Sequence, residues 1–284
     1  MKVSRHLFLD SEWIYFKIYA SSYIQQKLLR YEIFTVVEKL YKKKLLDKFF
    51  FVLYQDINGP HLRLRFLTSN ESGHREIVTT IAETFSPYLE KGIICKIVAE
   101  TYNRELERYG EQNIEEIETI FSVNSWYTLC FLKANPVFNE QKWLQSATII
   151  DRQLCELNFN MWERHKFCEH ALSLLNKKLG VTQETKKKLQ EIFKKYVYRD
   201  EFIFENVKST LTQVSYDRML ISTQTVVSKM NEGAKRDFIL NILHMAMNRI
   251  FPFSQNVYEL IIYDYMNCYY KMKIHNTKTG QLSY

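Results

Sequence analysis

The sequence predicts an α+β fold, with an antiparallel or mixed sheet in the N-terminal part packed with helices and a C-terminal half that is mostly helical. Before Gly110, several short runs are rich in aromatic and β-branched residues, which favour strands. After Gly110, apolar residues recur at helical spacing almost to the end of the chain. This order of elements is typical of a sheet with helices packed on one face.

The composition indicates one folded domain covering residues 1–284. The chain has only 7 Gly and 4 Pro and no tract that resembles a linker, while 46% of its residues are hydrophobic. Asp10 and Glu12 interrupt any secretory signal, and no apolar window is long enough to cross a bilayer. The 5 cysteines are scattered without a Cys-x-x-Cys pair, which is typical of reduced thiols and indicates a cytoplasmic protein.

The net charge of +7 is modest for this length, and lysine runs contribute much of it. Such runs are usually solvated helix faces. Aromatic residues are not arranged among these lysines as a stacking platform, so no nucleic-acid partner is expected.

The expected elements follow from local pattern. Residues 13–20 predict the first strand, and residues 23–46 a long amphipathic helix. A helix at 75–89 and a strand at 93–99 come next. In the second half, helices are expected at 114–121, within 142–179, from Thr182 as N-cap, at 235–251 and at 257–273.

The runs 49–54 and 61–66 predict a β-hairpin, because turn-forming Asp, Asn, Gly and Pro lie between them. Side chains alternate along a strand. One face would therefore carry His61, Arg63 and Arg65, and the other Leu62, Leu64 and Phe66. An apolar back face fixes such a strand against a core, so the sequence predicts a row of cationic groups on a rigid platform.

Two further motifs carry charge. If residues 104–109 turn helically, Glu105 and Arg108 share a face. In the predicted helix 235–251, His244 and Asn248 share a face, with Arg249 partly round the helix. Each motif alone has an ordinary explanation: charged runs on strands and helices are usually solvated, and a single histidine on an apolar helix is more often a core residue.

No cofactor is expected, since the chain has no Gly-rich phosphate loop, dinucleotide fingerprint, kinase signature or Gly-x-Ser-x-Gly elbow. No metal site is expected either. His165, Glu169 and His170 lie one turn apart, but they form no His-Glu-x-x-His pattern and lack a third ligand at a suitable spacing.

Taken together, the motifs resemble a known family. The runs at 13–19, 50–56, 59–66 and 101–110, followed by His244-Met245 and Asn248-Arg249, are similar to the C-terminal elimination domain of class I lantibiotic dehydratases. That family includes stand-alone thiopeptide-type bacteriocin biosynthesis proteins.

The resemblance implies a glutamate-eliminating lyase acting on a ribosomally made precursor peptide, in lanthipeptide or thiopeptide antibiotic biosynthesis. In the family, a separate domain or protein transfers glutamate from glutamyl-tRNA to Ser or Thr, and the elimination domain expels it to leave dehydroalanine or dehydrobutyrine. The expected partners are therefore the precursor peptide and a separate glutamylating subunit of a split dehydratase. A homodimer is also compatible with the sequence.

The resemblance also implies the site. The matching catalytic positions are Arg63, Arg65, Glu105, Arg108 and His244. Apart from these, we expect His61, on the same strand face as the two arginines, and Arg249, in the same late motif as His244, to bind substrate; support of its helix is the alternative role for Arg249. Guanidinium groups bind carboxylates bidentately, which suits the glutamyl leaving group, and fixed cations stabilise a developing enolate. His244 and Glu105 are suited to the proton transfers, and which of them is the base stays open.

Two alternatives remain. A diverged relative in thiopeptide pathways forms a pyridine ring from two dehydroalanines by a formal [4+2] cycloaddition, and the retained arginines and Glu105 argue against it. A non-catalytic peptide-binding partner subunit is the other, which a missing arginine set would have favoured.

Overall fold

The computed structural model describes residues 3–8, 11–134, 141–197 and 213–278. The chain folds into two compact units. Unit 1 consists of Met1–Pro136, Thr210–Lys229 and Asn248–Phe253, and unit 2 of Val137–Ser209, Met230–Met247 and Ser254–Tyr284. The single domain expected for residues 1–284 stays a prediction.

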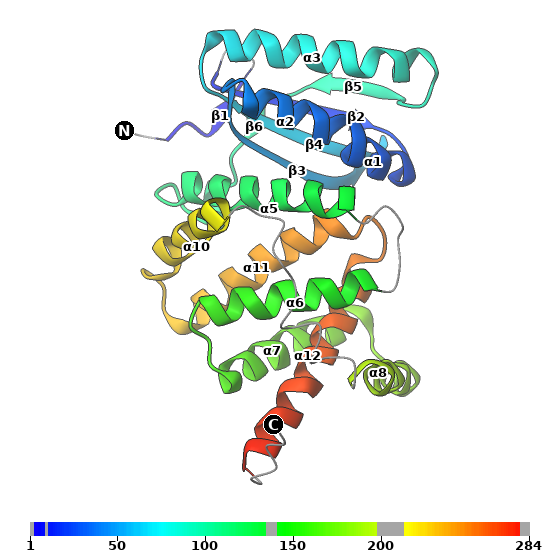
Figure 1. Cartoon of the computed structure of the whole chain (residues 1–284), viewed down its shortest axis with the longest axis vertical. Helices are drawn as coiled ribbons and strands as arrows, with labels where there is room; N and C mark the ends of the chain where they lie inside the picture. Colours follow the sequence, from blue (N-terminus) through cyan, green and yellow to red (C-terminus); the bar gives the residue numbers. More distant parts are fainter. Residues whose placement is uncertain (1–2, 9–10, 135–140, 198–212, 279–284) are drawn as a thin grey trace. The chain divides into compact units, whose positions relative to one another are not determined.

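Unit 1 contains two antiparallel sheets (Figure 1). The four-stranded sheet has the order β3-β4-β2-β5, and β1 pairs with β6. The strands are β1 (His6–Leu7), β2 (Trp13–Tyr19), β3 (Leu46–Asp56), β4 (Gly59–Thr68), β5 (Lys96–Ala99) and β6 (Tyr102–Asn103). The helices are α1 (Ser22–Leu28), the π-helical turn η1 (Leu29–Ile33), α2 (Phe34–Lys42), α3 (Glu71–Glu90), α4 (Leu106–Tyr109), α5 (Ile114–Ala134) and α10 (Gln213–Val227).

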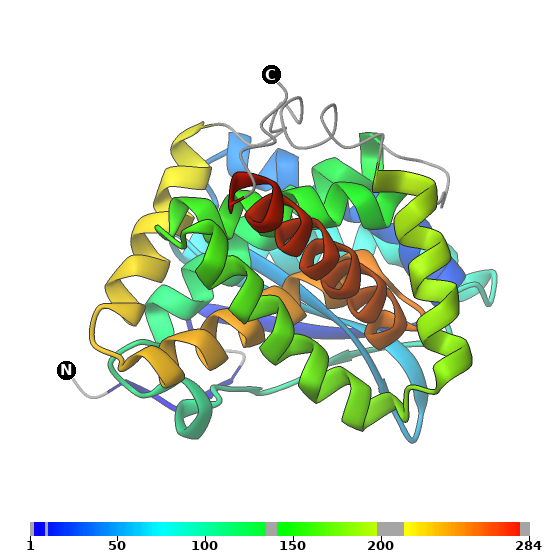
Figure 2. The ribbon, with the colours of Figure 1, turned by 90° about the horizontal axis from the view of Figure 1, so that it is seen from below.

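The regular secondary structure among the described residues of unit 2 is helical. Its helices are α6 (Gln141–Glu156), α7 (Met161–Leu179), α8 (Gln183–Tyr196), α12 (Gln255–Lys278) and most of α11 (Glu232–Ile250). Helix α7 packs along α12, the red helix of Figure 2. The predicted α+β class, with the sheet in the N-terminal part and helices after it, is confirmed.

The four-stranded sheet buries one apolar face, as the alternation in 61–66 predicts. Leu62, Leu64 and Phe66 are fully buried in the core of unit 1. Apolar side chains of α1, η1, α2 and α3 cover this face, and Figure 1 shows α2 lying across the strands. Burial of this face fixes the register of β4, so its other side chains must project from the opposite face.

The predicted helix 23–46 is wrong at its C-terminal end. The helix ends at Lys42, and Lys44 adopts a left-handed conformation with φ of 56°. The amide groups of Lys44 and Leu45 donate to the carbonyls of Tyr41 and Leu40, which is the hydrogen-bond pattern of a Schellman cap. A lysine stands where glycine usually ends a helix, so composition did not reveal the stop. The strand expected at 93–99 likewise begins later, at Lys96.

Side chains from helices cover the outer edge of β3, which α5 runs beside in Figure 1. The hydroxyls of Ser122 and Ser125 accept from the amides of Phe49 and Phe51, at 3.2 and 3.1 Å. The amide side chain of Asn248 pairs with both backbone groups of Leu53, at 3.1 and 3.2 Å. Nε of Arg249 donates to the carbonyl of Phe51 at 2.8 Å. These contacts occupy backbone groups that would otherwise invite another strand.

Candidate active site

Arg63 and Arg65 project from β4 on the face opposite the apolar core. In the register of the sheet, Arg65 lies between Tyr15 of β2 and Phe50 of β3, and Arg63 lies beside Lys17. Both arginines are partly exposed. The predicted alternation therefore places two guanidinium groups on one face of a central strand.

Arg65 rests on aromatic rings. Its Cζ lies 4.6 Å from the ring centre of Tyr15, 4.8 Å from that of Tyr102 and 5.1 Å from that of Phe50. Its Nε is buried without a hydrogen-bond partner, and no carboxylate of the described residues lies within 4.0 Å of it. Burial lowers the pKa of Arg65, and the nearby charge of Arg63 lowers it further. The site therefore holds a cation whose counterion is not supplied by the described part of the chain.

His61 differs from the expected cation. Its side chain is 0% exposed and packs against the rings of Tyr19 and Tyr54. Its Nε2 accepts from Nε of Arg63 at 3.3 Å, and Nδ1 lies 3.1 Å from the carbonyl of Gly59. Burial lowers its pKa, so the imidazole is neutral at pH 7. Of the three cations expected on this face, only Arg63 and Arg65 are therefore charged. His61 orients Arg63, whose Cζ lies 3.5 Å from the ring centre of Tyr54.

A buried ion pair anchors Tyr102, one of the three rings in contact with Arg65. Arg104 donates to both carboxylate oxygens of Glu118, at 2.7 and 2.8 Å. The hydroxyl of Tyr102 also donates to Glu118, at 3.0 Å. The hydrogen bond to Glu118 fixes Tyr102 in contact with Arg65. The carboxylate of Glu118 itself is paired with Arg104.

Charged residues from three separate segments lie near Tyr109 and influence the pKa of its hydroxyl group. Burial is the largest cause acting on the pKa of Tyr109 and raises it. The charges of Arg108, Arg249 and Arg65 lower this pKa, and that of Glu105 raises it. Glu105, the N-cap residue of α4, pairs with Arg108 across 3.4 Å, as their helical spacing predicts. Chain folding therefore brings α4, β4 and the end of α11 to one region of unit 1.

Arg249 is fully buried in this region. Its Cζ lies 4.9 Å from the ring centre of Phe121, while Nε holds the carbonyl of Phe51. Burial lowers its pKa to about 9, and the charge of Arg65 lowers it as well. At pH 7 the group is still protonated, so two like charges face the same region. Such an arrangement favours an anion.

His244 lies in unit 2, on α11. Its side chain is 36% exposed, and its Nδ1 lies 2.9 and 3.1 Å from the two carboxylate oxygens of Glu259. The imidazole is therefore neither sealed in the core nor free to rotate. Sequence reasoning missed Glu259, as it missed Tyr102, because neither residue is near its partner in the chain.

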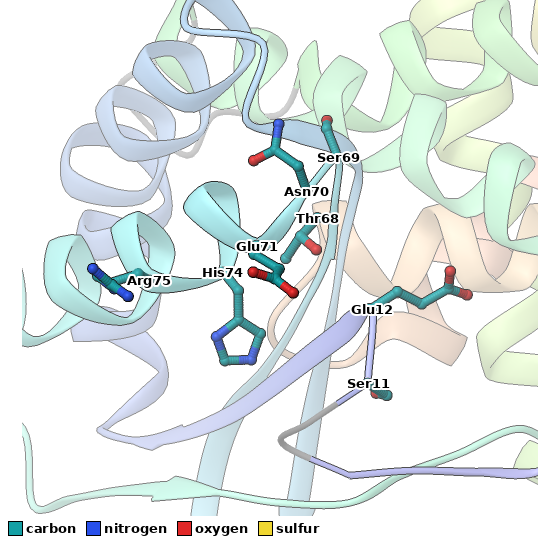
Figure 3. A pocket seen from close by; sticks show the side chains of 8 residues that line it. All are labelled: Ser11, Glu12, Thr68, Ser69, Asn70, Glu71, His74 and Arg75. Atoms are coloured by element: carbon teal, nitrogen blue, oxygen red, sulfur yellow. The ribbon is translucent and has the colours of Figure 1, made fainter.

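A hollow of about 520 Å³ lies at the start of α3, and Figure 3 shows the polar side chains that line it. It is lined by Ser11, Glu12, Thr68, Ser69, Asn70, Glu71, His74 and Arg75. None of the predicted site residues is among them. With two carboxylates and one arginine, this groove lacks the concentrated positive charge of the face around Arg65.

The two histidines of α7 each lie near a carboxylate. His165 lies 3.8 Å from Glu169, and His170 pairs instead with Asp237 at 2.9 Å. In the part of the chain that the structure describes, no group of three or more His, Cys, Asp or Glu is placed to hold a metal ion. Among the same residues, no helix combines the length and apolar character needed to cross a membrane.

The fold and the clustered guanidinium groups define an α+β protein with a positively charged face on its sheet. The chain belongs to the lantibiotic biosynthesis dehydratase C-terminal family, whose model matches residues 13–270. The match covers both units.

One sequence relative and two solved structures place the chain further. Subtilin biosynthesis protein SpaB of Bacillus subtilis is 29% identical over 119 residues, which are 40% of this chain and 11% of SpaB. The tRNA-dependent lantibiotic dehydratase MibB from Microbispora sp. 107891 has a TM-score of 0.65 at 15% identity, over 94% of this chain and 28% of MibB. TbtD, the pyridine synthase from thiomuracin biosynthesis, has a TM-score of 0.61 at 13% identity, over 92% of this chain and 99% of TbtD. The chain thus spans only a minor part of SpaB and MibB, and nearly all of TbtD.

Proposed function

We propose that this protein is a lyase that eliminates glutamate from glutamylated Ser or Thr residues of a ribosomally made precursor peptide, leaving dehydroalanine or dehydrobutyrine. One observation carries the proposal: the guanidinium of Arg65 lies on three aromatic rings without a carboxylate partner among the described residues. Membership of the dehydratase family supports it.

The proposed substrate supplies the missing anion. A glutamyl ester carries a carboxylate, and a guanidinium binds a carboxylate by two parallel hydrogen bonds. We assign this contact to Arg65 and Arg63, with Arg108 completing the positive field and Arg249 holding the region in place. His61 contributes indirectly, because it accepts a hydrogen bond from Arg63.

The reaction breaks the Cα–H and Cβ–O bonds and forms the Cα–Cβ double bond, and the proton passes to the general base. Removal of the α-proton leaves charge on the neighbouring peptide carbonyl, and fixed cations lower the free energy of that enolate. The Cβ–O bond then breaks, the Cα–Cβ double bond forms, and glutamate leaves with the bonding electrons. We assign the proton transfers to His244 and Glu105, because histidine and glutamate side chains serve as general acids and bases.

The proposal implies two partners. A precursor peptide provides the Ser or Thr, and a glutamylating component installs the ester. Because the matches cover 11% of SpaB and 28% of MibB, we propose that the glutamylating activity belongs to another part of the dehydratase or to a separate subunit. The protein would then act in lanthipeptide or thiopeptide biosynthesis.

A synthetic peptide bearing one glutamyl-serine tests the function directly. The purified protein should release free glutamate and leave dehydroalanine, as measured by an enzymatic glutamate assay and mass spectrometry. Arg65→Gln and His244→Ala should each leave the glutamylated peptide intact. Arg75→Gln, an exposed arginine of α3 in the same unit as Arg65, is the matched control and should retain full activity.

The pyridine-forming alternative predicts the opposite result in this peptide assay. An inert glutamyl-serine peptide, together with turnover of a peptide containing two dehydroalanines, would replace the lyase by a cyclase. The whole-length likeness to TbtD concerns the fold alone, so this substrate comparison decides between the two.

A further inference from the structure

We propose that Glu259 is a positioning residue that holds His244 as the Nδ1–H tautomer and makes Nε2 the atom that exchanges the proton with the substrate. The proposal rests on the proposed function, in which His244 takes part in proton transfer. Neither the resemblance nor the sequence pattern assigns a role to Glu259.

The geometry defines which atom of the imidazole is occupied. Both carboxylate oxygens of Glu259 lie near Nδ1, at 2.9 and 3.1 Å. A carboxylate accepts hydrogen bonds and donates none, so the proton of this contact belongs to Nδ1. The neutral ring then carries its lone pair on Nε2.

The amide group of Gln255 also lies near Nδ1 of His244, but its hydrogens are used in other hydrogen bonds. Its Nε2 donates to the carbonyl of His244 at 2.8 Å and to Oε1 of Glu259 at 2.6 Å. These two bonds use both hydrogens of the amide group, although the same nitrogen lies 3.1 Å from Nδ1. Gln255 therefore ties the first turn of α12 to α11 and orients the carboxylate.

Burial separates this pair from an ordinary surface ion pair. The side chain of Glu259 is 4% exposed, whereas that of His244 is 36% exposed. The carboxylate is thus shielded from water, whereas the imidazole that it contacts is partly exposed. Tyr263, one helical turn after Glu259, is buried, and this burial raises its pKa, as does the charge of Glu259. Tyr263 therefore stays neutral and does not compete for the proton.

The arrangement resembles the third member of a hydrolase triad in its physical effect. A buried carboxylate behind Nδ1 orients the ring and stabilises the imidazolium that forms when Nε2 takes up a proton. Whether His244 takes or gives a proton in the elimination, Nε2 is the atom involved, because the carboxylate of Glu259 occupies Nδ1.

Nitrogen NMR of the full chain, with ¹⁵N in the histidine rings, measures the tautomer without any activity assay. The His244 signals are assigned by their loss in His244→Asn. We expect a protonated Nδ1 and an unprotonated Nε2 at a pH where the ring is neutral. An Nε2–H tautomer of His244 in the wild-type protein would overturn the proposal, and this result requires no variant of Glu259 to fold.

Kinetics of Glu259→Gln on the glutamyl-serine peptide provide the second readout. We expect kcat to fall by about 10²-fold or more, while KM changes by less than about 3-fold, since the tautomer is lost but the arginine contacts remain. Asp237→Asn removes another carboxylate that contacts a histidine at 2.9 Å, in the same unit, and should leave kcat unchanged. A wild-type kcat in Glu259→Gln would also overturn the proposal.

The two hypotheses fail separately. If the wild-type protein holds the Nδ1–H tautomer and Glu259→Gln loses it, but no glutamate is released from the peptide, the proposed function is wrong and the positioning by Glu259 stands. If glutamate is released and Glu259→Gln changes neither tautomer nor kcat, the positioning is wrong and the function stands.

Discussion

Arg65 and Tyr102 are in cation–π contact, with Cζ of the guanidinium 4.8 Å from the centre of the ring. The phenol is in turn anchored to Glu118 by a hydrogen bond of 3.0 Å. The cation of Arg65 is thus held in place by the faces of aromatic rings, and the buried carboxylate of Glu118 pairs with Arg104 instead. Rings orient the guanidinium without neutralising it, so its charge stays available to a ligand.

Replacing Arg65 by methionine should therefore separate activity from stability. Methionine keeps the apolar stem in contact with the rings and removes a partly desolvated charge, so the free energy of unfolding should stay within about 1 kcal/mol of the wild-type value. Glutamate release should be lost. Urea unfolding and the peptide assay measure the two effects, and a loss of about 3 kcal/mol or more would make Arg65 a structural residue.

Free glutamate should stabilise the wild-type protein. A product that binds only the folded state raises the unfolding midpoint with concentration, by about 2.7 kcal/mol at 100 times its Kd. Thermal unfolding with increasing glutamate measures the shift, which should disappear in Arg65→Met and persist in Arg75→Gln. Equal shifts in all three proteins would indicate a nonspecific effect of the solute.

The Arg104–Glu118 pair should be essential to the fold. The side chains are 5% and 1% exposed, so Glu118→Gln leaves an uncompensated buried cation and should cost about 3–5 kcal/mol. The surface pair of Arg5 and Glu107 is the contrast, with side chains 43% and 70% exposed. Glu107→Gln should leave the unfolding free energy nearly unchanged, because surface ion pairs contribute little to stability. Similar losses in both variants, measured by urea unfolding, would contradict this account.

Removing a serine hydroxyl that covers the edge of β3 should lower the free energy of unfolding. Ser125→Ala leaves the buried amide of Phe51 without its acceptor, which should cost about 1–3 kcal/mol. The hydroxyl of Ser86 donates to a carbonyl of its own exposed helix, so Ser86→Ala should stay within about 0.5 kcal/mol of wild type. Chemical unfolding of both variants tests the difference, and an unchanged Ser125→Ala would show that water replaces the hydroxyl.

His61 should make the fold sensitive to mild acid. Burial lowers its pKa below the ordinary value of 6.5. Above pH 6.5 the ring is neutral in both the folded and the unfolded chain, so it contributes no pH dependence. Below that value the unfolded chain binds a proton that the folded protein does not, and stability falls until the folded pKa is reached.

His61→Phe removes this titration while keeping a ring between Tyr19 and Tyr54. Between pH 7.5 and about 5.5, the wild-type unfolding free energy should fall by more than that of the variant. Urea midpoints at these two pH values provide the comparison. Parallel pH profiles would mean that His61 is protonated in the folded protein and that Arg63 has lost its acceptor.

Local pattern predicted the elements that its own residues control. Alternation in 61–66 correctly separated the arginines from the core leucines, and Glu105 and Arg108 pair as their spacing requires. Thr182 caps α8 as expected, with its hydroxyl accepting from the amide of Thr185. Local pattern did not predict the end of the helix before Lys44, because Lys44 adopts a backbone conformation that is rare for lysine.

Contacts between distant segments lay beyond that pattern. Leu53 and Asn248 are 195 positions apart, yet the amide of one covers the backbone of the other. The neutral state of His61 depends on two tyrosines from neighbouring strands, and the partner of His244 comes from the next helix.

The amino-acid order by itself determined the fold class, the faces of β4 and the resemblance to the dehydratase family, because these depend on side-chain type and on periods of two to four residues. Only the tertiary structure decided that Arg65 stands without a carboxylate, that His61 is neutral and that Glu259 holds His244. Charge and tautomer depend on burial and on neighbours brought together by packing, and no local period encodes those neighbours.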